Sequence, residues 1–171
     1  MKTLLGVIAL FSWMAGDWVG KGETTFPATG SKTILTAQVR SSVENGHLLS
    51  RNQLTATPLD GVGNPGKSAT YDRVYCIRPR SDQDPASAKY FVFIYGDCVS
   101  ADGSELDDTH AASVGQLNDR TLEVEQKLGP DYVIHSKTEF FVDGTSTYSE
   151  TSFIQNTINS VTTITYRPTN Q

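Results

Sequence analysis

From residue 17 onward, apolar and polar residues alternate along almost every segment of this 171-residue chain, and short clusters of Gly, Asn, Asp and Pro interrupt the alternation. A period of two is typical of β-strands with two different faces, whereas the crossover helices that parallel strands need are missing. The pattern therefore predicts an antiparallel protein whose strands are Asp17–Phe26, Lys32–Val43, Gly46–Thr57, Ala69–Arg78, Lys89–Val99, Arg120–Lys127, Tyr132–Val142, Ser146–Asn156 and Ser160–Arg167.

The connections between these strands indicate hairpins. Asn45-Gly46 and Asp143-Gly144 are dipeptides that take the positive φ angles of two-residue hairpin turns. An open sheet of this size would leave long unpaired edges, which closure into a barrel removes. Neither face of Tyr132–Val142 is purely apolar, as in a barrel that encloses a cavity. We expect an all-β fold, a single antiparallel up-and-down barrel of about eight to ten strands, with a β-sandwich as the alternative.

The N-terminal segment "TLLGVIALFSWMAG" differs from the rest because it predicts a helix that ends at Gly16. We expect one domain over residues 1–171, in which residues 1–16 form a helix that closes one end of a barrel over residues 17–167. Alternatively, residues 1–16 are a residual leader, because Lys2 and the apolar run after it resemble a secretory signal without a clear cleavage site. Glu105–Leu117 is expected to hold a turn of helix or a lid-like loop.

Charge excludes some partners. The formal net charge is −5, and the 14 Lys and Arg residues are scattered singly, so no basic surface for nucleic acid is expected. The N-terminal apolar run is too short to span a bilayer. Oligomeric state leaves no recognisable pattern in the sequence.

Gly16-Asp17-Trp18 at the head of the first strand resembles the Gly-x-Trp signature of the calycin superfamily, which includes lipocalins and fatty-acid-binding proteins. The resemblance implies that Trp18 lies across the closed end of the barrel and that Arg167, at the end of the last strand, stacks on it. The wider phrase "FSWMAGDWVGKGE", with Gly20 and Gly22, is similar to the opening of nitrobindin-like and related bacterial barrels of unknown function. Alternating glycines let such a strand bend sharply.

Candidate ligand-binding residues lie on the central strands. Tyr75, Arg78 and Tyr95 would line a pocket for a carboxylate or a polar headgroup if they point inward, with His135 and Phe140 contributing from a later strand. No catalytic motif of a serine hydrolase, zinc protease or P-loop is present, so no catalytic residue is predicted. The loop "DDTH" at residues 107–110 is interpreted as a solvated acidic loop rather than a metal site. We expect no cofactor; the nitrobindin-like resemblance implies haem ligation by His135 as the alternative.

Cys76 and Cys98 are the two cysteines. A simple hairpin would pair Cys76 with a residue near Ile94, four positions short of Cys98, so a disulfide needs a bulge or an asymmetric loop. Buried free thiols are the alternative. A disulfide would favour a secreted or periplasmic protein, and free thiols a cytoplasmic one.

These observations lead us to expect a protein that binds or carries a small, largely apolar ligand in the barrel cavity, rather than an enzyme. An inward Glu–Arg or Tyr–Arg pair would instead favour an isomerase or cyclase acting on a lipid-like substrate. A barrel filled by side chains would indicate a structural or interaction protein. That third case would be favoured if bulky residues all point inward, such as Phe91, Phe93, Phe140 and Phe153.

Overall fold

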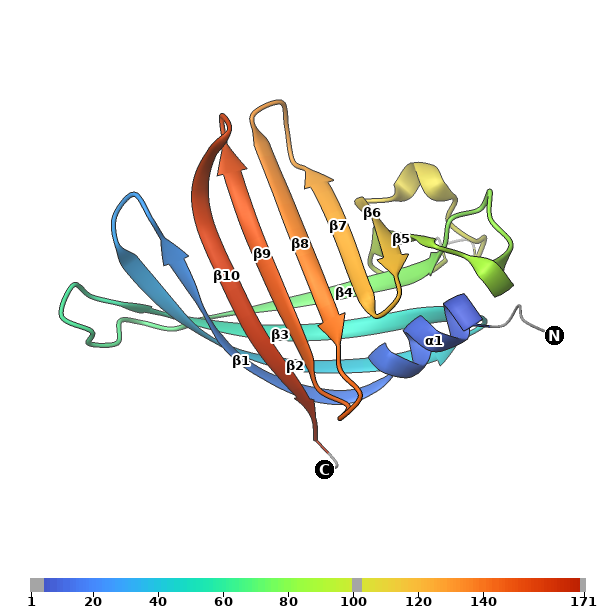
Figure 1. The fold of residues 1–171 in the computed structure, drawn as a ribbon, viewed down its shortest axis with the longest axis horizontal. Coiled ribbons are helices and arrows are strands. Elements are labelled where there is room, and N and C mark those ends of the chain that lie inside the picture. The colour runs from blue at the N-terminus through green and yellow to red at the C-terminus, as the bar shows by residue number, and fades with distance from the viewer. Residues whose placement is uncertain (1–4, 100–102, 170–171) are drawn as a thin grey trace.

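The computed structural model describes residues 5–99 and 103–169, with one helix, ten strands and two 3₁₀ turns in those ranges (Figure 1). The elements are α1 (Leu5–Met14), β1 (Gly16–Phe26), β2 (Ser31–Glu44), β3 (His47–Leu59), β4 (Ala69–Pro79), η1 (Pro85–Ser87), β5 (Tyr90–Tyr95), η2 (Asp108–His110), β6 (Ser113–Asn118), β7 (Thr121–Lys127), β8 (Tyr132–Phe140), β9 (Ser146–Ile154) and β10 (Thr157–Pro168).

The strands form a closed barrel in which each strand pairs antiparallel with its neighbours in sequence. β1 completes the ring because it pairs with both β2 and β10. The predicted all-β, up-and-down barrel is therefore confirmed, and the sandwich is excluded. The sequence did not predict β6, most of which lies inside the segment Glu105–Leu117. The turn of helix predicted for that segment is present as η2.

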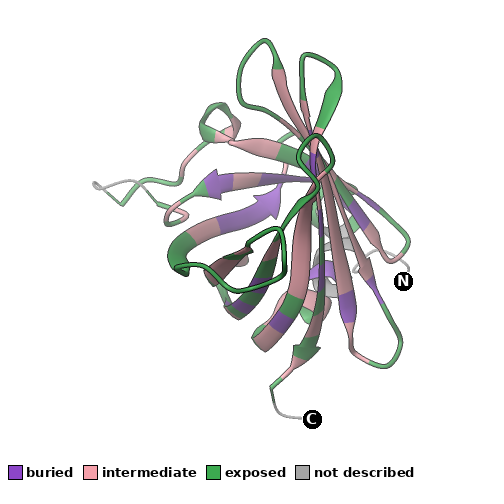
Figure 2. Ribbon diagram, turned by 90° about the vertical axis from the view of Figure 1, so that its left-hand side faces the viewer, coloured by how far each residue is buried: buried purple, intermediate pink, exposed green. Residues whose placement is uncertain are grey.

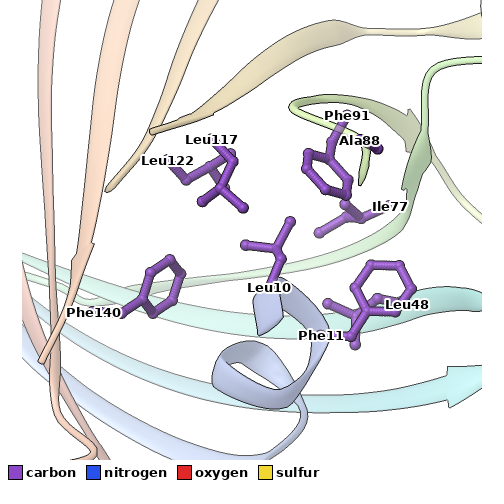
Figure 3. Packing of buried hydrophobic residues seen from close by; sticks show 9 residues of the cluster. All are labelled: Leu10, Phe11, Leu48, Ile77, Ala88, Phe91, Leu117, Leu122 and Phe140. Carbon is purple, nitrogen blue, oxygen red and sulfur yellow. The ribbon is translucent and has the colours of Figure 1, made fainter. Parts of the chain in front are cut away.

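Helix α1 lies at one end of the barrel, as expected, and fills it (Figures 1 and 3). Leu10 and Phe11 of α1 are buried among side chains from six strands or their connections. Those partners are Leu48, Ile77, Ala88, Phe91, Leu117, Leu122 and Phe140. Among the described residues, no helix is long and apolar enough to cross a membrane. Residues 1–4, which include the charged start of the possible leader, lie outside the described residues.

The Gly-x-Trp phrase connects this helix to the first strand. The backbone of Ala15 donates to the carbonyl of Phe11 at 2.8 Å, and Gly16 then takes a φ of 112°, which L-residues rarely adopt. The indole N–H of Trp18 donates to the carbonyl of Met14 at 3.2 Å. Trp18 thus satisfies one of the carbonyls that a helix leaves unpaired at its C-terminus.

The predicted stacking of Arg167 on Trp18 is not found in the structure. Trp18 lies opposite Pro168 in the β1–β10 pairing, and Arg167 lies opposite Val19. Because neighbouring residues of a strand point to opposite faces, Arg167 lies on the outer face and Trp18 on the inner one. A guanidinium does lie over the indole of Trp13, because the Cζ atom of Arg120 is 5.7 Å from the centroid of that ring.

Candidate functional site: the inner wall of the barrel

The core around α1 identifies the inner wall. Ile77, Phe91 and Phe140 contact the helix from inside the barrel, so every second residue from each of them, and their direct cross-strand partners, also point inward. Beyond the core, the inward positions differ in exposure (Figure 2): side chains such as Ser152 and Thr162 are buried, whereas Tyr148 and Glu150 are of intermediate exposure and Arg73 and Tyr95 are exposed. Solvent therefore reaches the part of the interior that α1 does not fill.

Several polar side chains share this accessible part of the interior, and we call them the interior polar cluster. Its members come from β4, β5, β7, β8, β9 and β10, and they are Arg73, Tyr75, Tyr95, Gln126, Ser136, Tyr148, Glu150 and Tyr166.

One half of the cluster is built around Arg73. Its Nη1 donates to the Tyr75 hydroxyl at 3.5 Å, and the ring of Tyr75 packs against that of Tyr95 with 5.1 Å between centroids and a tilt of 36°. Gln126 donates to the Tyr95 hydroxyl at 3.3 Å. The hydrogen bond to Tyr75 raises the pKa of the Arg73 guanidinium, and burial raises the pKa of the Tyr75 hydroxyl. This half of the wall offers a permanent positive charge beside two aromatic rings.

The other half is built around Glu150. The Tyr148 hydroxyl donates to Glu150 Oε2, and Ser136 is the cross-strand partner of Glu150. Burial, followed by the charge of Glu150, raises the pKa of Tyr148 well above its ordinary value. Tyr148 therefore stays protonated and remains a hydrogen-bond donor at neutral pH.

Tyr166 gives a testable pH dependence because burial raises its pKa to about 12. An unfolded chain releases the proton near pH 10. Below pH 10 both states are protonated; above it the folded state binds more protons, so the free energy of unfolding falls until about pH 12. We expect Tyr166→Phe to flatten this alkaline decline by up to about 2 kcal/mol, measured by urea unfolding at a series of pH values. Parallel pH profiles for the two proteins would contradict the assignment.

Three of the five predicted ligand residues lie on the inner wall. Tyr75 and Tyr95 belong to the interior polar cluster, whereas Phe140 lies at the α1 end with its ring 5.4 Å from that of Trp13. Arg78 and His135 lie on the outer face because they differ by an odd number of positions from Tyr75 and Phe140. These two are therefore not brought together with the others.

Arg78 serves instead to hold residues 105–108 against the outside of the barrel. Its side chain is 6% exposed, and its Nη2 lies 2.8 Å from Asp108 Oδ1 and donates to the carbonyl of Leu106 at 2.8 Å. Cys76 and Cys98 form a disulfide beside it. The expected pairing of Cys76 with Ile94 is confirmed, and the chain then turns at Gly96, with φ 93°, to bring Cys98 back to Cys76.

The surroundings of His135 do not fit an axial haem ligand. Its side chain is 57% exposed, with Nε2 at 3.7 Å from Glu125 Oε2 and its ring edge-on to Phe153. The outer groove that includes His135 is lined mainly by charged and polar residues, among them Glu123 and Lys137. A largely apolar macrocycle would gain little there. Among the described residues, no group of three or more His, Cys, Asp or Glu side chains is arranged to hold a metal ion.

Sequence reasoning missed Arg73, Tyr148, Glu150 and Tyr166. The sequence does contain a pattern that points to Arg73. Arg73 and Tyr75 are two positions apart and must share a face of their strand, whereas Arg78 is three positions from Tyr75 and lies on the opposite face. Tyr148 and Glu150 show the same spacing on β9. Which face is the inner one, however, follows only from the contacts with α1.

Comparisons with known proteins agree with this architecture. No protein-family model and no curated protein matches the chain. Among solved structures, the S-type phycobiliprotein lyase CPES from Guillardia theta is similar, with a TM-score of 0.59, 8% sequence identity, and coverage of 94% of this chain and 89% of that one. At this identity the likeness concerns the fold alone. The chain is thus a closed, ten-stranded antiparallel barrel whose fold is similar to that of this lyase.

Proposed function

We propose that this protein binds a small, largely apolar molecule non-covalently in the part of the barrel interior that α1 leaves open. The observation that carries the proposal is the unequal filling of the barrel. Apolar side chains pack tightly around Leu10 and Phe11 at one end, whereas beyond them the inner wall bears aromatic rings and a few polar groups accessible to solvent. Concave, mostly apolar sites with few polar groups are typical of small-molecule binding.

The filled-barrel alternative is less well supported. Phe91, Phe93 and Phe140 do contribute to the core at the α1 end. Phe153, however, lies on the outer face, where its ring contacts His135. The bulky side chains that fill the interior thus cluster near the helix, whereas the buried inward side chains of β2, β9 and β10 outside that cluster, such as Leu35, Ser152 and Ile164, include none of these aromatic rings.

A blocking substitution tests ligand binding. Ser136 points inward and its neighbour Lys137 points outward on the same strand, so Ser136→Trp and Lys137→Trp add the same ring on opposite faces. We expect the neutral fluorescent probe N-phenyl-1-naphthylamine to bind the wild type and Lys137→Trp, and to bind Ser136→Trp at least about tenfold more weakly. Circular dichroism checks folding, and Ser136→Phe is the milder substitute if Ser136→Trp does not fold. Equal probe binding by folded inward and outward variants, or none by the wild type, would overturn the proposal.

An isomerase-type enzyme is the second candidate, because Arg73 and Tyr75 form an inward Tyr–Arg pair and Glu150 supplies a carboxylate. In such a reaction Glu150 would take a proton from the α-carbon of a β,γ-unsaturated ketone and Arg73 would stabilise the dienolate oxygen. The proton would then return to the γ-carbon, which moves the double bond into conjugation and regenerates the carboxylate. The test is deuterium incorporation into 2-octanone in deuterated buffer, followed by NMR. Incorporation above the buffer rate that Glu150→Gln abolishes would support it; no incorporation would reject it for this class of ketone.

The disulfide supports a secreted or periplasmic location for this binding protein. Cys76 and Cys98 are bridged in the structure, and structural disulfides persist in oxidising compartments.

A further inference from the structure

The charges on the inner wall are few. Among the inward positions of the described strands, the ionised side chains are Arg73 on β4 and Glu150 on β9. The other acidic and basic strand residues occupy outward positions, where several pair with one another, as Lys137 does with Glu139. The interior therefore carries one positive and one negative group.

These two groups face each other across the barrel. In the ring of strands, β4 and β9 are separated by β5 to β8 in one direction and by β10, β1, β2 and β3 in the other, which are four strands each way. No ion pair within 4.0 Å joins Arg73 to Glu150 in the described structure. The pKa of the Arg73 guanidinium is raised mainly by its hydrogen bond to Tyr75, and the charge of Glu150 adds a smaller contribution.

Both groups retain unused hydrogen-bonding capacity. A guanidinium has five N–H donors, and the hydrogen bond that the structure gives Arg73 is the long one to the Tyr75 hydroxyl. A carboxylate accepts about four hydrogen bonds, and the protein donor to Glu150 is the Tyr148 hydroxyl. The two tyrosines hold the charged groups in place, and neither group neutralises the other directly.

We propose that the ligand is bipolar, with an anionic group bound by Arg73 and a cationic or hydroxyl donor bound by Glu150, joined by an apolar body. This inference rests on the proposed function, since it assigns the class of molecule that the interior binds. A purely anionic amphiphile would leave Glu150 unpaired and repelled, and a neutral one would leave both charges unpaired. A charged group left without a partner in a partly desolvated site weakens binding.

The packed rings of Tyr75 and Tyr95 provide a surface for the body of such a ligand next to its anionic end. Aromatic rings combine a large apolar area with a hydroxyl that stays hydrogen-bonded. Arg73 and this ring pair lie on adjoining strands, so the anionic group and the first part of the apolar body would be recognised together.

Three ligands of equal chain length test the inference by competition with N-phenyl-1-naphthylamine: octanoate, octylamine and 8-aminooctanoate. We expect 8-aminooctanoate to compete at least about tenfold better than either monopolar ligand, although it is the most water-soluble of the three. In the Glu150→Gln variant, 8-aminooctanoate should compete no better than octanoate does. In the Arg73→Met variant, it should compete no better than octylamine does. Asp72→Asn on β4 and Glu125→Gln on β7 change outward charges and should leave the order of the three ligands unchanged.

The outcomes separate this inference from the proposed function. If the neutral probe binds and Ser136→Trp blocks it, but 8-aminooctanoate competes no better than octanoate or Glu150→Gln has no effect, the bipolar ligand is rejected and small-molecule binding stands. If the probe itself does not bind in the interior, the proposed function fails. The neutral probe should still bind to Glu150→Gln and Arg73→Met. If either variant loses probe binding, these residues maintain the barrel rather than select the ligand, and the inference is rejected.

Discussion

Gly22→Ala is expected to destabilise the barrel by roughly 3–5 kcal/mol, measured as the free energy of unfolding in urea. A Cβ at Gly22 would lie 1.9 Å from the carbonyl oxygen of Thr163 and 2.7 Å from the Cα of Ile164. Both atoms belong to the backbone of β10, so relief requires β1 and β10 to move apart at the pairing that closes the barrel. The effect arises from overlap with backbone, because Gly22 has no positive φ.

Two matched variants test whether overlap with the backbone of β10 causes the loss of stability in Gly22→Ala. Gly61→Ala adds the same methyl group where no atom lies within 4 Å and φ is not positive, so its unfolding free energy should stay within about 0.5 kcal/mol of the wild type. Gly20→Ala would meet the ring of Tyr166 at 2.6 Å, a side chain rather than backbone, so Tyr166→Ala should restore part of its stability. A Gly22→Ala protein as stable as Gly61→Ala would contradict the close approach of the two strands.

Removal of the disulfide by Cys76→Ala with Cys98→Ala is expected to lower the free energy of unfolding by about 3 kcal/mol. The bridge closes a loop with a sequence separation of 22 and so restricts the unfolded chain. It also covers Val92 and Ile94, against which Leu106 and Ala111 of the following segment pack. Hydrogen–deuterium exchange should therefore rise first in residues 103–112, while the barrel strands stay protected.

The matched comparison is reduction of the wild type. A thiol assay should detect no free thiol in the native oxidised protein and two after reduction under denaturing conditions, and the reduced protein should unfold at the same urea concentration as the double variant. Arg78→Met should release the same segment without changing the thiol count, because it leaves Asp108 without its guanidinium partner. Native protein with two reactive thiols would show that the bridge does not form.

The strands and turns were the part of the fold that local sequence determined. Alternation placed most strand boundaries within a few residues, and Asn45-Gly46, with φ angles of 50° and 80°, forms the predicted hairpin turn. β6 was missed because it is short and follows an acidic loop whose composition predicts no strand. The predicted strand Lys89–Val99 was too long, since Gly96 turns the chain after Tyr95.

The two cysteines show where local sequence stops being sufficient. Counting along the hairpin correctly places Cys76 opposite Ile94, but it does not decide whether the chain beyond Tyr95 continues or folds back. The turn at Gly96 and the packing of Leu106 on the outer face decide it. Disulfide formation depends on the distance between two Cα atoms, here 5.0 Å, which only the folded chain defines.

By itself, the sequence determined an antiparallel, all-β barrel with a helix at its start, and it determined which residues of one strand share a face, such as Arg73 with Tyr75. Only the tertiary structure decided which face is the inner one and which strands oppose each other. The register between the first and last strands is set by closure of the barrel, and a slip of one residue exchanges the two faces, which is why Arg167 was misplaced relative to Trp18. The opposition of Arg73 and Glu150 likewise depends on a ring of ten strands, since no local pattern brings residues so far apart in sequence to facing walls.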